Sequence, residues 1–224
     1  MITLHHLENS RSQRIAWLLE ELGAEYDVKV YQRDSVTILA PPELKAVHPL
    51  GKSPVITDGD VTVAESGAII EYLLDKTGGD ALRPEAGTPE RREFTFWLHY
   101  AEGSMMPLML LALVMNRIET APLPFFIRPV AKGIAQKVRG GFLDDNIQRH
   151  LEFIDQTLEI RPWFAGDTFS AADIQMSYCL EAAAKRADID GKFPKIADFL
   201  NRIREREAYG KAESRVGSFD LPKV

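Results

Sequence analysis

Three side chains suited to binding or activating an anion lie close together near the N-terminus: Asn9, Ser10 and Ser12. They follow a strand-like run and precede a helical pattern, and ligands of open α/β sheets bind at such carboxyl ends of strands. The N–H groups that begin the following helix also favour a phosphate, a carboxylate or a thiolate. The same residues fit an ordinary helix cap, because Ser10 and Gln13 have the spacing of a capping box. This window alone leaves a catalytic hydroxyl and a cap both open.

Two further polar segments flank an expected hairpin. In the first segment, Lys52 precedes Pro54 and Val55. A proline that opens a strand fits an edge position or a cis turn. The lysine by itself fits a solvated surface residue. After the hairpin, Glu65 suits an ammonium group, while Ser66 and the N–H groups behind it suit a carboxylate. Side by side they would hold the zwitterionic end of an α-amino acid, unless Ser66 is simply a helix N-cap.

The sequence lacks the motifs of several other kinds of functional site. The five histidines show no metal-ligand spacing, so we expect no metal site, and His5 and His6 would point to opposite faces of a strand. No Cys-x-x-Cys, Gly-x-x-x-x-Gly-Lys, Gly-x-Ser-x-Gly or Gly-x-Gly-x-x-Gly motif occurs. Cys179, the single cysteine, lies among apolar residues, which favours an inert core position and a reducing, cytoplasmic compartment.

The elements that must position these residues begin as an α/β pattern. Short strand-like runs alternate with helical ones, and an Asp-Gly turn joins the last two runs. This order is β-α-β, a short helix, then β-β-α. The expected strands are 2–7, 26–31, 55–57 and 61–64; the expected helices run from Ile15 to Gly23, over 41–46, and from Ile69 to a break at Gly78 and Gly79.

The rest of the chain shows only the 3.6-residue period of helices. We expect one long helix over 89–118, kinked at Pro107, and further helices at 143–158, 173–184 and 197–206. Ser170 and Asp173 have the spacing of a capping box with a structural role. The predicted organisation is an α/β domain over 1–79, a linker at 80–88 and an all-helical domain over 89–224.

Composition excludes several classes of protein. The 224 residues are 45% apolar and 27% charged, which is typical of a globular chain. The net charge of 27 − 33 = −6 argues against binding to nucleic acid or to anionic lipid. The longest uncharged apolar run, 103–116, is shorter than the ~20 residues of a membrane span, and no signal peptide is visible.

Taken in order, these motifs resemble those of the cytosolic glutathione transferases, and the similarity covers residues 2–209. Its most specific part is His-Pro-Leu-Gly-Lys-Ser-Pro at 48–54, followed beyond the hairpin by Glu65 and Ser66; the family has Asn more often than His at the first position. The stretch 10–22 is most similar to bacterial and fungal serine-type members. The resemblance implies a thioredoxin-like N-terminal domain followed by a helical bundle, glutathione as co-substrate, an electrophilic small molecule as second substrate, and a homodimer.

The resemblance also implies roles for the polar residues, in which Ser10 activates the glutathione thiol and Asn9 and Ser12 are its alternates. The implied glutathione ligands are Lys52 for the glycyl carboxylate, cis Pro54, Val55 pairing through its backbone with the cysteinyl part, and Glu65 with Ser66 for the γ-glutamyl end. One hydrogen bond to a thiolate supplies about 1.5–3 kcal/mol, and a helix N-terminus adds about 0.3–1 kcal/mol. Lowering the pKa of the thiol by two units takes about 2.7 kcal/mol, so we expect a serine at this helix to be sufficient to activate the thiol.

The second-substrate pocket is expected along the long helix. A flexible apolar stripe there suits varied electrophiles, although the same stripe fits ordinary core packing. Its members are Met105, Met106 and Met109 with Phe125 and Phe126, and Tyr100 and Glu102 on the same helix are candidates to face the cleft. The expected reaction is transfer of an electrophilic carbon to the glutathione sulfur. A glutathione-dependent disulfide or peroxide reductase and a non-catalytic scaffold are the alternatives, and the complete set of glutathione ligands speaks against the scaffold.

Overall fold

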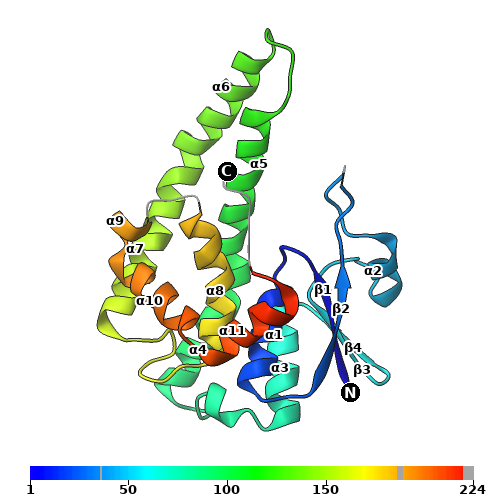
Figure 1. Ribbon diagram of the computed structural model, residues 1–224. Helices are drawn as coiled ribbons and strands as arrows, with labels where there is room; N and C mark the ends of the chain where they lie inside the picture. The colour runs from blue at the N-terminus through cyan, green and yellow to red at the C-terminus, as the bar shows by residue number, and fades with distance from the viewer. Residues whose placement is uncertain (36, 186–188, 219–224) are drawn as a thin grey trace.

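The computed structural model describes residues 1–35, 37–185 and 189–218. A four-stranded sheet with its helices forms the N-terminal part, and a bundle of helices follows it, with a long helical hairpin that projects away from the sheet (Figure 1). The expected class, a thioredoxin-like α/β domain followed by an all-α domain, is confirmed. The linker proposed at 80–88 contains a 3-10 turn at Asp80–Leu82.

The sheet places the N-terminal strand at its centre. Its strands are β1 (Ile2–Leu7), β2 (Tyr26–Tyr31), β3 (Val55–Asp58) and β4 (Val61–Ala64), in the order β2-β1-β3-β4. β1 runs parallel to β2 and antiparallel to β3, and β3 runs antiparallel to β4. The two histidines of β1 bond to different partners, His5 to Tyr31 and Thr57 and His6 to Ser12, as the alternation of a strand requires.

Helices α1 (Ser12–Glu21), α2 (Pro42–Val47) and α3 (Ser66–Thr77) complete the N-terminal part. The helix caps that the sequence leaves open at Ser10 and at Ser66 do not form. Helix α1 has Arg11 at its N-cap without a side-chain hydrogen bond, so Ser10 and Gln13 make no capping box. Ser66 is the first residue of α3, with Glu65 at the N-cap. The Ser10 hydroxyl instead bonds to Ser12 and Ser53, and the Ser66 hydroxyl bonds to Arg14.

The expected long helix is continuous but changes its hydrogen-bond register. Helix α4 (Pro89–Tyr100) passes through a π-helical turn at Ala101–Met105 into α5 (Met106–Thr120). Pro107 has no N–H to donate to the preceding turn, and the wider turn comes directly before it, where the Met106 N–H bonds to the Ala101 carbonyl. The expected kink is therefore a π turn.

This continuous helix, Pro89–Thr120, is long and apolar enough by length and composition to cross a membrane, contrary to the expectation from the shorter uncharged run. Half of its most apolar window is buried inside the protein. A core helix passes the same test, and Phe94, Trp97 and Leu98 belong to the hydrophobic core.

The remaining helices build the bundle around α4 and α5. Sequence patterns missed α6 and α11, because each buries few apolar side chains: α6 buries Ala135, and α11 buries Tyr209 and Ala212. Helix α11 packs against α1, which joins the C-terminal helix to the start of the chain (Figure 1). These helices are α6 (Arg128–Val138), a π turn at Arg139–Leu143, α7 (Asp144–Ile160), α8 (Ala171–Ala184), α9 (Ile189–Lys192), α10 (Pro194–Arg204) and α11 (Glu207–Val216).

The capping box predicted for α8 is confirmed. The Asp173 carboxylate accepts hydrogen bonds from the Ser170 N–H at 2.8 Å, from the Ser170 hydroxyl at 3.0 Å and from the Phe164 N–H at 2.8 Å. Burial raises the pKa of Asp173 to about 6, and these donors oppose that shift. At neutral pH the group is therefore an ionised acceptor in the core.

Replacing Asp173 with asparagine is expected to lower the free energy of unfolding by about 1–3 kcal/mol. The amide would turn an N–H group toward N–H donors that now share a carboxylate, leaving a buried donor unsatisfied. Urea denaturation at pH 7.5 measures the loss, with Asp60→Asn in the exposed hairpin turn as the matched control. Equal midpoints for the two variants would contradict the structural role.

Candidate active site

The turn between β1 and α1 buries the candidate hydroxyl. Asn9 has a positive φ of 50° and its side chain is exposed, whereas Ser10 is only 6% exposed and Ser12 is fully buried. The Ser10 Oγ lies 2.7 Å from the Ser12 Oγ and 3.3 Å from the Ser53 Oγ. Of the three candidates, Ser10 is thus the one that links the start of α1 to the loop before β3.

That loop contains the cis peptide bond expected at Ser53–Pro54. The Ser53 hydroxyl fixes it to β1 by donating to the His5 carbonyl at 3.0 Å and accepting from the Leu7 N–H at 3.3 Å. The candidate hydroxyl and the proline loop, 43 residues apart in sequence, therefore meet at one end of β1.

Val55, whose backbone is expected to pair with a ligand, lies inside the sheet. Val55 pairs with His5 of β1 on one side and with Ala64 of β4 on the other, so it has no open strand edge. Ser53 lies outside the strand, which begins at Val55, and its hydroxyl bonds to that of Ser10. The preceding Lys52 is exposed at the surface.

Glu65 and Ser66 lie at the start of α3 with different environments. Glu65 is exposed and has a positive φ of 72°, a backbone conformation that is uncommon for a non-glycine residue. Ser66 is buried, and its hydroxyl accepts a hydrogen bond of 2.9 Å from Nη2 of Arg14. The two side chains assigned to the amino-acid end of a ligand are thus one exposed acid and one fixed hydroxyl.

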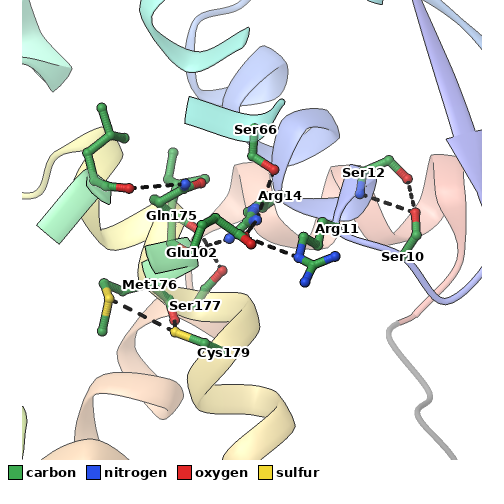
Figure 2. A network of polar contacts seen from close by, with 12 residues as sticks. Ser10, Arg11, Ser12, Arg14, Ser66, Glu102, Gln175, Met176, Ser177 and Cys179 are labelled. Carbon is green, nitrogen blue, oxygen red and sulfur yellow. Dashed lines mark hydrogen bonds and ion pairs between the residues drawn. The ribbon is translucent and has the colours of Figure 1, made fainter. Parts of the chain in front are cut away.

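Arg14 connects this segment to the helical domain, a role that sequence reasoning missed (Figure 2). Its guanidinium is 2% exposed, donates to the Gln175 carbonyl at 2.6 Å and forms an ion pair with Glu102 of the π turn. Arg11 Nε also reaches Glu102, at 3.1 Å, and both guanidinium groups lie over the Tyr178 ring. An arginine in a helix start carries no sequence signal that separates this buried role from a surface one.

His6 is the second residue that the sequence did not single out. Its Nδ1 lies 2.8 Å from the Ser12 Oγ, which places an imidazole two hydrogen bonds from Ser10. Burial lowers the pKa of His6, while the nearby Glu8 and a hydrogen bond to the Val216 backbone act in the opposite direction.

The residues expected to line a second-substrate pocket lie mainly in the core. Met105, Met106 and Met109 are buried, and the Tyr100 hydroxyl bonds to Nδ1 of His150. Phe125 and Phe126 are exposed instead, at 82% and 66%. The core interpretation of the methionine stripe is the one that these positions support, because the side chains fill space between helices.

The single cysteine of the chain takes no part in this site. Cys179 is fully buried, and burial raises its pKa to about 12, which keeps it a thiol. Among the residues that the structure describes, no cluster of three His, Cys, Asp or Glu side chains could hold a metal ion. What the arrangement offers is a buried hydroxyl, the N–H groups at the start of α1 and the fixed loop at Ser53.

Comparisons with known proteins agree with this geometry. Residues 1–75 match the model of the glutathione S-transferase N-terminal domain, and residues 124–209 match that of the C-terminal domain. Glutathione S-transferase 3 of Schizosaccharomyces pombe is 35% identical over 96% of this chain and 88% of its own length.

Two other relatives extend the comparison. A crystal structure of a glutathione S-transferase from Actinobacillus pleuropneumoniae superposes with a TM-score of 0.82 at 34% identity, over 98% of this chain and 95% of that one. The disulfide-bond oxidoreductase YfcG of Escherichia coli is 27% identical over 95% of this chain and 94% of its own length.

Proposed function

Since the chain belongs to the glutathione S-transferase family, we propose that it binds glutathione, holds the thiol as a thiolate beside Ser10 and directs it at an electrophilic carbon. The observation that carries the proposal is the position of the Ser10 hydroxyl, buried between the start of α1 and the cis-proline loop. A thiol of pKa ~8.5 is only a few per cent ionised at pH 7, so stabilising its anion is the main catalytic task.

The roles of the other residues follow from their environments. Ser66, fixed by Arg14, offers the N–H groups of the α3 start to the γ-glutamyl carboxylate, and the exposed Glu65 receives the ammonium group. Lys52 at the surface receives the glycyl carboxylate. The backbone of Ser53 takes the role expected earlier of Val55, because it lies outside the strand ladder and next to Ser10.

Calorimetric titration with glutathione, followed by a conjugation assay with an aryl halide, tests the proposal. We expect binding and formation of a thioether. Absence of glutathione binding would overturn both this proposal and the redox alternative.

Glu65→Ala is expected to weaken glutathione binding about tenfold, because a charged hydrogen bond to the ammonium group is lost. Calorimetric titration of the variant measures the change. Glu71→Ala is the matched control, since Glu71 is exposed on the same helix. Unchanged affinity in the Glu65 variant would remove this residue from the binding site.

A disulfide reductase is the second candidate, and the similarity to the E. coli oxidoreductase favours it. The same glutathione thiolate would attack a disulfide sulfur instead of a carbon, and the mixed disulfide would form on the substrate, since Cys179 is buried. Parallel assays with an aryl halide and with a small glutathione-reducible disulfide separate the two reactions.

The proposal also includes a homodimer in the cytoplasm with an apolar electrophile as second substrate. The homodimer and the electrophile follow from the family resemblance, and the compartment follows from the single cysteine, which is buried and free.

A further inference from the structure

A line of buried hydrogen bonds leads from Ser10 to the C-terminal helix. The Ser10 and Ser12 hydroxyls lie 2.7 Å apart, and the Ser12 hydroxyl lies 2.8 Å from Nδ1 of His6. The backbone of Val216, at the end of α11, raises the pKa of His6, as an accepting carbonyl beside the imidazole does. Figure 2 shows the first link, between Ser10 and Ser12 at the start of α1. The three side chains are at most 6% exposed.

The tautomer of His6 sets the direction of the two hydrogen bonds that join it to Ser12 and Ser10. A carbonyl only accepts, so the ring nitrogen of His6 that faces Val216 carries the proton, and in the neutral ring Nδ1 is then an acceptor. Ser12 must donate its single hydroxyl proton to Nδ1. Ser10 must therefore donate its proton to Ser12, since Ser12 has no other proton to share.

This direction leaves Ser10 as an acceptor on its ligand side. Its proton points toward Ser12 at 2.7 Å, with the Ser53 hydroxyl as a second, longer acceptor at 3.3 Å. It also accepts the Ser12 backbone N–H at 3.3 Å, which leaves one lone pair of the oxygen. In this state the hydroxyl can accept the S–H of a thiol but cannot donate to a thiolate. A reversal of the whole line is needed before Ser10 stabilises the anion.

We propose that Ser10, Ser12 and His6 form a proton wire that ionises the bound thiol of glutathione, an inference that rests on the function proposed above. The S–H bond breaks and its proton goes to Ser10 Oγ, the Ser10 proton goes to Ser12 Oγ, and the Ser12 proton goes to His6 Nδ1. The products are a thiolate and an imidazolium, so charge and protons balance. The Ser10–Ser12 and Ser12–His6 hydrogen bonds now point the other way, and Ser10 donates to the sulfur. His6 acts through the two serines and is a positioning residue.

The surroundings of His6 suit a group that is neutral at rest and charged only beside a thiolate. Burial, the largest effect, lowers its pKa, and Glu8 at the end of β1 opposes this. Charged groups on the elements packed around it have other partners: Arg14 of α1 pairs with Glu102, Lys29 of β2 lies over Tyr31, and Arg215 of α11 pairs with Glu20. A new negative charge on the ligand sulfur therefore favours the imidazolium without a competing fixed cation.

The test compares His6→Asn with His5→Asn in the full-length protein. An asparagine at position 6 keeps an oxygen that accepts from Ser12 but takes no proton, and His5 is the matched control, a buried histidine on the same strand that bonds to Tyr31 and Thr57. The ultraviolet absorbance of bound glutathione thiolate is followed against pH. Calorimetry in two buffers of different ionisation enthalpy counts the protons released on binding.

In the wild type and in His5→Asn, we expect the thiolate to form without net proton release near neutral pH. In His6→Asn, the midpoint of thiolate formation rises by about one pH unit or more, each thiolate releases a proton to the buffer, and turnover at neutral pH falls about tenfold. Ser12→Ala, a smaller change in the same line of hydrogen bonds, is the second variant, and we expect the same three effects from it. It keeps the test decisive if His6→Asn folds poorly. The double variant His6→Asn/Ser12→Ala loses no more turnover than either single variant, because both changes interrupt the same line.

Two results would contradict the inference in different ways. If the wild type binds glutathione without forming a thiolate, the proposed function itself fails. The second result is that the wild type forms the thiolate while His6→Asn and Ser12→Ala form it with the same pH midpoint and release the same number of protons. In that case the proposed function stands and the proton wire is refuted.

Discussion

Ser10→Ala is expected to lower turnover in glutathione conjugation about 10- to 100-fold, while the affinity for glutathione changes little. We propose the Ser10 hydroxyl, buried beside Ser12 and Ser53, as the group that hydrogen-bonds the sulfur, and a hydrogen bond to a charged group contributes about 1.5–3 kcal/mol. Affinity depends mainly on the other ligands of the peptide, so the loss falls on thiolate formation. Turnover and the thiolate absorbance of the complex measure the two effects separately.

Asn9→Ala is the comparison for this experiment, because Asn9 occupies the adjacent position and its side chain is exposed. We expect its turnover to remain near that of the wild type. A larger loss in the Asn9 variant than in the Ser10 variant would assign the sulfur contact to Asn9 and would also remove the starting point of the proton wire.

Arg14→Met is expected to lower the free energy of unfolding by about 3 kcal/mol, the largest stability effect that the site predicts. Methionine keeps much of the volume but leaves the Gln175 carbonyl, the Ser66 hydroxyl and one face of Glu102 without their donor. Glutathione affinity should fall as well, since Ser66 loses the contact that fixes it. Urea denaturation and calorimetric titration measure the two losses.

Arg11→Met is the matched control, because Arg11 pairs with the same Glu102 and lies over the same Tyr178 ring but is one-third exposed. Its loss should stay below about 1 kcal/mol, as for other partly solvated ion pairs. Similar losses in the two variants would show that burial of Arg14 is not what makes its contacts strong.

Local patterns were enough to predict the strands and most of the helices. The alternation at 2–7 and 26–31, the Asp-Gly turn and the capping box of Ser170 and Asp173 each depend on neighbours within a few residues. Helix α11 was missed because its stability comes from packing on α1, and its own apolar pattern is short. The position of Val55 was also beyond local patterns. Its backbone is covered because β1 pairs with it on one side and β4 on the other.

The sequence by itself determined the fold class, the family resemblance and the set of polar residues around one turn, since these depend on residue type, period and spacing. Only the tertiary structure decided which of them act together. Ser10 meets Ser53 across 43 residues, Ser66 meets Arg14 across 52, and His6 lies between the first turn of α1 and the last turn of α11. The physical reason is that a hydrogen bond has direction and a buried group must find its partner, and the fold, not the spacing along the chain, supplies both.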